Sequence, residues 1–145
     1  DELERGAALF PGAEMLLVPL GYRQLERRLF SQARATFESI VARDADAVRR
    51  KRLWIARALD GQGRYHEALS MVQSARDVFP TDPEVLEVFA HLAATVGRYD
   101  EAIEALEIAA RGDAAKAAAY ADRLERLRRS RDEEKQRRII EGSGR

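Results

Sequence analysis

Gly63-Arg64-Tyr65 returns about 34 residues later as Gly97-Arg98-Tyr99, which is the spacing of repeats built from two helices. A Glu-Ala pair follows each tripeptide, as Glu67-Ala68 and as Glu101-Ala102. Apolar residues then recur at i, i+3, i+4 and i+7, the pattern of an amphipathic helix. The sequence therefore predicts a turn at each glycine and a helix after it.

Each turn is preceded by another helical segment, which carries a bulky apolar residue followed by a small one. These pairs are Ile55-Ala56 and Phe89-Ala90, and the small member allows two helices to approach closely. An upstream copy has Leu20-Gly21 as its pair and Phe30 in place of the tyrosine. That copy lacks the glycine, so we expect Arg28-Leu29-Phe30 to turn with ordinary backbone. Six repeat helices are predicted, near residues 14–28, 31–43, 47–60, 64–79, 82–95 and 98–111.

These residues resemble the tetratricopeptide repeat family, which has Leu-Gly or its equivalent in the first helix, Gly-x-Tyr at the turn and small residues along the second helix. The resemblance covers roughly Glu14 to Gly112. It implies an all-α fold, a right-handed superhelical stack of about three helix pairs with a long C-terminal capping helix and a short N-terminal helix. The expected division is a helix in 1–12, three repeats in 13–112 (13–45, 47–80 and 82–112), a capping helix in 114–139 and a flexible tail in 140–145.

Turn and capping residues give the expected helix ends. Thr81-Asp82-Pro83-Glu84 combines capping side chains with a proline suited to a first helical turn. Gly112-Asp113 suits a left-handed stop, and Asp44-Ala45-Asp46 a break between repeats. Pro19 should either kink its helix or mark the first turn of that helix.

The segment from Ala114 to Ile139 begins rich in alanine, becomes strongly charged over 123–129 and is nearly all charge past Ser130. Tyr120, Leu124 and Leu127 recur at helical spacing, so we expect them to cover the last repeat as a cap. The N-terminal segment should form one more helix, with Leu3, Ala7, Ala8 and Phe10 on its apolar side and Pro11-Gly12 at its end. It could be the second helix of a missing repeat.

The residues offer little for catalysis. The chain has no cysteine, and its two histidines, His66 and His91, lie on separate predicted helices. The glycines fall singly at helix ends, so no phosphate-binding loop is present. Acidic pairs such as Asp100-Glu101 and Glu104-Glu107 are interpreted as a solvated helix surface. We therefore expect neither an enzyme nor a cofactor, a metal or a catalytic residue.

The longest N-terminal apolar run, Met15-Leu16-Leu17-Val18-Pro19-Leu20, is too short to span a bilayer. We expect a cytoplasmic protein, or else a soluble domain of a membrane-associated or periplasmic protein.

In the tetratricopeptide repeat family, the first helix of each pair lines a concave groove that holds a peptide or helix of a partner. By that resemblance the candidate partner-binding residues are Met15, Val18, Tyr22, Leu25, Arg50, Leu53, Trp54, Arg57, Glu87, Val88 and His91, with Glu84 beside them. Trp54 either lies partly exposed between Arg50 and Arg57, as in an interface hot spot, or packs against the first repeat. Its replacement by alanine should weaken partner capture in the first case.

The carboxylate clamp of some family members requires Lys, Asn and Arg side chains where this chain has Val18, Tyr22, Trp54, Glu84 and Val88. An apolar or amphipathic partner segment with some acidic character is expected instead. Net charge is zero, but 23–57 is rich in arginine and 60–113 is acidic. This polarity favours a protein partner over nucleic acid and allows head-to-tail self-association.

The sequence thus predicts an adaptor or scaffold domain that binds a peptide segment. Two alternatives stay open. One is a chaperone for a secreted client, because compact three-repeat proteins with extra terminal helices resemble type III secretion chaperones. The other is a regulatory or dimerising domain of a larger multidomain or membrane-associated protein.

Overall fold

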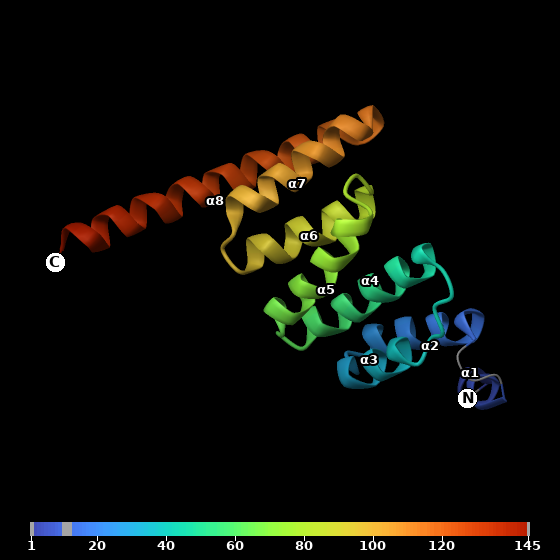
Figure 1. Ribbon diagram of the computed structural model, residues 1–145. Helices are drawn as coiled ribbons and strands as arrows, with labels where there is room; N and C mark the ends of the chain where they lie inside the picture. Colours follow the sequence, from blue (N-terminus) through green and yellow to red (C-terminus); the bar gives the residue numbers. More distant parts are fainter. Residues whose placement is uncertain (1, 10–12, 145) are drawn as a thin grey trace. The chain divides into compact units, whose positions relative to one another are not determined.

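The computed structural model describes residues 2–9 and 13–144, and every regular element in those ranges is helical (Figure 1). The chain divides into two compact units, Asp1–Ala75 and Arg76–Arg145. Phe10 and Pro11-Gly12, which were expected to close the N-terminal helix, lie outside the described residues, as does Arg145. The fold class predicted from the repeats, all-α helix pairs, is confirmed.

The first unit contains α1 (Glu2–Leu9), α2 (Glu14–Glu26), α3 (Phe30–Glu38), α4 (Ala45–Gly61) and most of α5 (Tyr65–Val78). Helix α2 packs against α1 and α3, and α3 packs against α4. The core side chains come from the apolar faces of these helices. They are Leu17, Leu20, Ala33, Phe37, Ile40, Ala47, Leu53, Trp54, Ile55, Ala56, Ala58, Leu59, Ala68, Leu69, Val72 and Ala75.

The second unit contains α6 (Pro83–Thr95), α7 (Tyr99–Gly112), a 3₁₀ turn η1 (Ala114–Lys116) and α8 (Ala117–Ser143). Helix α7 packs against α6 on one side and α8 on the other. The core side chains are Val85, Leu86, Phe89, Ala90, Leu92, Ala93, Ala102, Ile103, Ala105, Leu106, Ala109, Tyr120 and Leu124. Tyr120 and Leu124 cover the last repeat as predicted, and Leu127 is half-buried beside them.

The turns between paired helices share one main-chain arrangement. The N–H of Gly63 donates to the carbonyl of Asp60 at 2.9 Å, and the N–H of Arg64 donates to that of Leu59 at 2.9 Å. This pair of bonds is a Schellman motif, which needs a left-handed residue at its centre. Gly63 and Gly97 supply that residue, with φ of +75° and +82°.

The upstream copy makes the same turn without a glycine. Arg28 has φ of +60°, and its N–H donates to the carbonyl of Leu25 at 2.9 Å while Leu29 donates to Gln24 at 2.8 Å. The expectation of ordinary backbone at Arg28-Leu29-Phe30 is therefore wrong. Main-chain hydrogen bonds hold an arginine where the other copies use glycine, which means that the three turns are equivalent despite their different residues.

The small residue of the Leu20-Gly21 pair allows the close approach that was expected. A methyl group at Gly21 would overlap the ring of Phe37, which is fully buried on α3. The ring of Phe37 also stacks on Trp54 of α4, with centroids 5.8 Å apart. Gly21 therefore brings α2 close to the aromatic core of the first unit.

Aspartate side chains cap three helices. Asp82 accepts a hydrogen bond from the Val85 N–H at 3.0 Å, with Pro83 in the first turn of α6 as predicted. Asp44 accepts from the Ala47 N–H at 2.8 Å at the start of α4. Asp113 accepts from the Ala115 N–H at 3.0 Å at the start of η1.

The left-handed stop expected at Gly112-Asp113 is not found. Gly112 is the last residue of α7, and α7 ends because Asp113 adopts extended backbone with φ of −144° and ψ of 94°. The side chain of Asp113 then caps the next turn, so one residue both ends α7 and begins the path to α8.

Two other helix ends differ from expectation. Helix α3 ends at Glu38, before the predicted 43, because buried Ile40 leaves the helix and its carbonyl accepts a hydrogen bond from Lys51 Nζ at 2.7 Å. Pro19 lies inside α2 and does not mark its first turn. Residues 140–143, assigned above to a flexible tail, continue α8 in the structure.

Candidate partner-binding surfaces

The candidate groove residues fall in both units. Those on α2 and α4 belong to the first unit, and Glu87, Val88 and His91 on α6 belong to the second. Their exposure varies widely. Met15 is 85% exposed, whereas Leu53 is buried within the core.

Trp54 packs inside the first unit instead of standing partly exposed. It is 8% exposed, and its indole Nε1 donates to the Tyr22 hydroxyl at 3.0 Å. Arg57 Nη1 donates to the same oxygen at 3.0 Å, and the Tyr22 ring meets Phe37 edge-on at 6.0 Å. The helical phase predicted that Trp54 lies towards the groove, with packing against the first repeat as the alternative, and the geometry matches the alternative.

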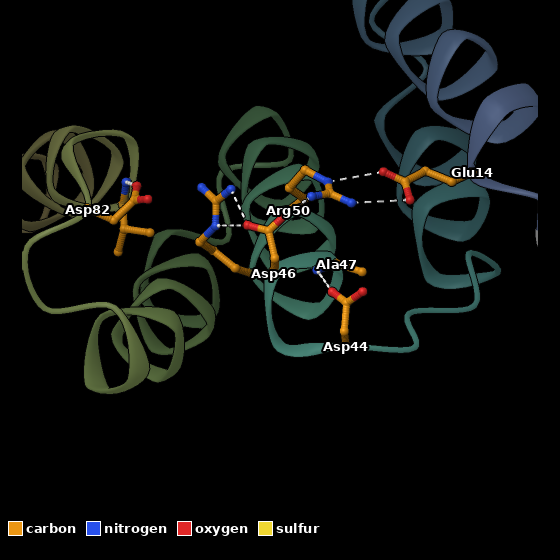
Figure 2. A network of polar contacts seen from close by, with 8 residues as sticks. Glu14, Asp44, Asp46, Ala47, Arg50 and Asp82 are labelled. Atoms are coloured by element: carbon orange, nitrogen blue, oxygen red, sulfur yellow. Dashed lines mark hydrogen bonds and ion pairs between the residues drawn. The ribbon is translucent and has the colours of Figure 1, made fainter.

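A second polar link joins the start of α2 to the first half of α4. Arg50 Nε donates to Glu14 Oε1 at 3.1 Å, and Arg50 Nη1 pairs with Asp46 of its own helix (Figure 2). The hydrogen bond to Glu14 raises the pKa of Arg50. A hydrogen bond from Arg49 is the main cause that lowers the pKa of Asp46. Glu14 was not among the candidate residues, although it lies one position from Met15.

Several candidate groove residues of the first unit remain accessible to solvent, and those with apolar side chains lie along α2. Met15 is exposed, and Val18, Tyr22 and Leu25 are half-buried. Arg50 and Arg57 of α4 are also half-buried. The first unit therefore presents apolar side chains next to arginines that are already hydrogen-bonded within it.

On the second unit, α6 and α8 enclose a cleft of about 360 Å³. Its apolar lining comes from Ala90 and Ala94 of α6 and Leu127 of α8. Arg123 and Arg126 of α8 add two cations, and His91 is the candidate residue that it includes. Both arginines were missed because the register of α8 against α6 follows from packing. The signal available was their alternation with Leu124 and Leu127.

One end of α8 is fixed to α6 by a buried tyrosine. Tyr120 is 2% exposed, and its hydroxyl donates a hydrogen bond to the carboxylate of Glu87. Burial, reinforced by this hydrogen bond, raises the pKa of Tyr120 to about 12. Glu87, a candidate groove residue, is thereby engaged inside the unit, with Lys116 Nζ also 4.0 Å from it.

Further along, arginines of α8 pair with carboxylates of α7. Arg128 lies 3.1 Å from Glu107, and Arg131 lies 3.4 Å from Asp100. The acidic residues of α7 are thus not only a solvated surface, because two of them hold the capping helix. In the same region Arg98 pairs with Glu101, as Arg64 pairs with Glu67 one repeat earlier.

A further cleft of about 580 Å³ lies in the first unit, beside α3, α4 and α5. Ile40, exposed Val41, Lys51 and Arg52 contribute to its lining. Lys51 is already bound to the Ile40 carbonyl. This cleft was not foreseen, because it opens where α3 ends early.

Within the described ranges, no group of His, Asp and Glu side chains could hold a metal ion. In the same ranges, none of the helices combines the length and the apolar character needed to cross a membrane.

Comparison with known proteins supports the fold. Residues 59–127 match the family model described as tetratricopeptide repeat. No curated protein matches the chain in sequence. The solved TPR domain of P58(IPK) gives a TM-score of 0.68 at 18% identity over 81% of this chain, which spans only 33% of that structure.

Two bacterial structures are similar over most of their own length. A T3SS complex from Aeromonas hydrophila has a TM-score of 0.65 at 19% identity, covering 80% of this chain and 81% of that one. PcrH from Pseudomonas aeruginosa has a TM-score of 0.62 at 22% identity, covering 79% of this chain and 90% of that one. PcrH has also been solved in complex with the chaperone binding region of PopB. At these identities the likeness shows the fold alone.

Proposed function

Because residues 59–127 match the family model described as tetratricopeptide repeat, we propose that the protein is a non-catalytic interaction domain that binds a segment of a partner protein. The observation that carries this proposal is the open surface along α2, where Met15 is 85% exposed beside half-buried Val18 and Leu25. An exposed apolar side chain beside partly accessible ones forms a continuous apolar patch, and such patches are typical of interaction sites. Hydrogen-bonded Arg50 and Arg57 border this surface on α4 and give it a polar rim.

Affinity capture with variants of the exposed surface tests this proposal. Trp54→Ala is unsuitable because it would remove a buried side chain from the core. Met15→Glu changes an exposed residue instead, and Val78→Glu on α5 is a matched control, since Val78 is 57% exposed. Proteins captured by the unmodified chain should be lost with Met15→Glu and kept with Val78→Glu, while circular dichroism stays the same for all three. Equal capture by both variants would contradict the use of this surface.

A chaperone for a secreted client is a second candidate. The observation that favours this role is the extent of the structural match. This chain matches 96% of the length of PcrH in the complex with the chaperone binding region of PopB. A chaperone of this kind should co-purify with one client and keep it soluble. Co-expression with and without the chain measures that dependence, and a client soluble without the chain rules this role out.

The cellular setting and assembly belong to the same proposal. We place the protein in the cytoplasm, with a partner segment of amphipathic and acidic character. Self-association between the arginine-rich 23–57 and the acidic 60–113 is the form of assembly suggested by the sequence. Light scattering should then show a mass that falls as salt is added, and a monomer at every salt concentration excludes self-association.

A further inference from the structure

Two arginines of α8 differ from the others in having no carboxylate partner. Further along the helix, Arg128 pairs with Glu107 and Arg129 with Glu125, and the arginines at 131, 137 and 138 are paired as well. Among the described residues, Arg123 and Arg126 form no ion pair. The unpaired cations are therefore confined to one stretch of α8.

That stretch faces the cleft between α6 and α8. Arg123 and Arg126 are three positions apart on one helix, so their side chains share a face, and both line the cleft. Arg123 is half-buried and Arg126 is exposed. Ala90 and Ala94 of α6 lie opposite and leave room for an entering side chain, while Leu127 provides apolar contact.

Asp122 and Glu125 neighbour the two arginines on α8, but within the described residues neither carboxylate forms an ion pair with Arg123 or Arg126. Glu87 is the carboxylate of α6 near this end of α8, and it accepts the hydrogen bond of Tyr120. Lys116 lies 4.0 Å from Glu87 as well. His91, the other titratable residue that lines the cleft, is exposed on α6 and can add no negative charge. An anion entering the cleft would consequently meet two arginines with free hydrogen-bond donors.

We propose that this cleft binds an acidic segment of the partner protein, with a carboxylate held by Arg123 and Arg126 and a neighbouring apolar side chain against Ala90, Ala94 and Leu127. Guanidinium groups bind carboxylates through paired, charge-assisted hydrogen bonds. A peptide fits better than a nucleic acid because the cleft lining includes no aromatic side chain on which a base could stack. This inference rests on the proposed function and names the partner chemistry at one place on the molecule.

Selection from a phage-displayed library of random 12-residue peptides tests the inference. The baits are the full chain, its double variant Arg123→Gln with Arg126→Gln, and the control Arg137→Gln with Arg138→Gln. Both variants change the net charge of α8 equally, but the control residues pair with Glu134 outside the cleft. The unmodified chain and the control should enrich peptides that carry Asp or Glu beside apolar residues, and the cleft variant should not.

Fluorescence anisotropy with one enriched peptide then gives affinities. Replacing its acidic residue by the matching amide, or using the cleft variant, should each weaken binding at least ~10-fold. The two changes together should weaken it little further, since they remove the same contact. Equal weakening by the control variant would show that only net charge matters, and would overturn the site.

The remaining outcomes separate the two proposals. Enriched peptides without acidic residues would overturn this inference and leave the proposed function standing. If the unmodified chain enriches no peptide, this inference is overturned, while the proposed function is decided separately by affinity capture with Met15→Glu and Val78→Glu. Displacement of the peptide by a 12-nucleotide single-stranded DNA at equal concentration would identify nucleic acid as the ligand and also overturn the inference.

Discussion

At the scale of single residues, Phe37 shows how the first unit is organised around one ring. Gly21 lies against one part of the ring, Trp54 stacks on its face and Tyr22 meets it edge-on. Gly21 and Tyr22 belong to α2 and Trp54 belongs to α4, so the ring on α3 links three helices. A change in the volume at any of these places must be absorbed by the others.

Gly21→Ala is expected to lower the free energy of unfolding by about 1–3 kcal/mol, because the added methyl overlaps the fully buried ring of Phe37. Urea denaturation followed by circular dichroism measures this loss. Gly142→Ala is the control, since a Cβ there meets nothing within 4 Å. The same stability for both variants would show that Phe37 has room to move.

Arg28→Gly is expected to stabilise the chain. A left-handed backbone costs an ordinary residue roughly 1–2 kcal/mol, while glycine adds about 0.4–1 kcal/mol of unfolded-state entropy. A net gain between zero and about 1.6 kcal/mol should follow, measured by the same denaturation. Gly63→Ala makes the opposite change at the equivalent turn and should destabilise by a similar amount. A loss of stability in Arg28→Gly would mean that the side chain contributes more than its backbone costs, for example through Phe30, whose ring centroid is 5.8 Å from the guanidinium.

The conformation of a residue could be predicted from the sequence where the chemistry of that residue favours one backbone conformation. Gly63 and Gly97 could be assigned to left-handed turns because glycine favours that backbone. Arg28 could not, since its conformation is imposed by hydrogen bonds of its neighbours. Trp54 was undecided because a rotation of α4 by a fraction of a turn moves it from the surface to the core.

At the scale of elements, α8 is attached to α6 by a hydrogen bond that depends on protonation. Tyr120 must keep its proton in order to donate to Glu87. Burial favours the neutral phenol, which is why the pKa of Tyr120 is raised to about 12. The attachment of α8 is thus sensitive to strongly alkaline pH.

Ultraviolet titration should show one of the four tyrosines ionising about two pH units above an ordinary phenol. The raised pKa stabilises the fold fully below about pH 10, the unfolded value, and this contribution is lost as pH rises through about 12. Tyr120→Phe should remove the late step and leave the other steps unchanged. If the late step persists in Tyr120→Phe, it belongs to another tyrosine.

Helix starts could be predicted better than helix ends or helix contacts. Asp82 and Pro83 predict the start of α6, because capping and the first-turn proline depend only on residues that are adjacent in the sequence. The early end of α3 depends on the burial of Ile40 and on Lys51, which is distant in sequence. The cleft beside Arg123 depends on how α8 lies against α6, and no local pattern encodes that register.

At the scale of the whole molecule, the repeated pattern predicted the helix pairs, because the spacing of the repeats equals the length of one helix pair with its turns. The division into units at Ala75 and Arg76 could not be foreseen, because it falls inside α5 and the repeat pattern continues across it. The groove residues were assigned by resemblance and remain a prediction. Their burial could differ from residue to residue because each depends on the packing of its own unit.

A chain ending at Asp132 should keep its stability within about 0.5 kcal/mol. Helix α8 continues past the first turn of α7, where Arg131 meets Asp100 (Figure 1). Beyond that point its side chains are exposed, except for half-buried Glu134. Thermal unfolding measures the effect. A chain ending at Lys116 is the comparison, and it should be strongly destabilised because it loses buried Tyr120 and Leu124. A large loss in the first truncation would show that the projecting segment has a structural contact.

The beginning and the middle of α8 are held by different forces, and this governs how the helix opens. Tyr120 and Leu124 hold its beginning by burial, whereas exposed ion pairs at Arg128 and Arg131 hold its middle. Exposed pairs are worth at most about 1 kcal/mol and are screened by salt. Fraying therefore starts at Ser143 and proceeds towards Tyr120, so that amide hydrogen exchange should slow steadily in that direction. Salt should speed exchange near Arg131 and leave it unchanged near Tyr120. Ionic strength would then control how far towards the cleft the end of α8 frays.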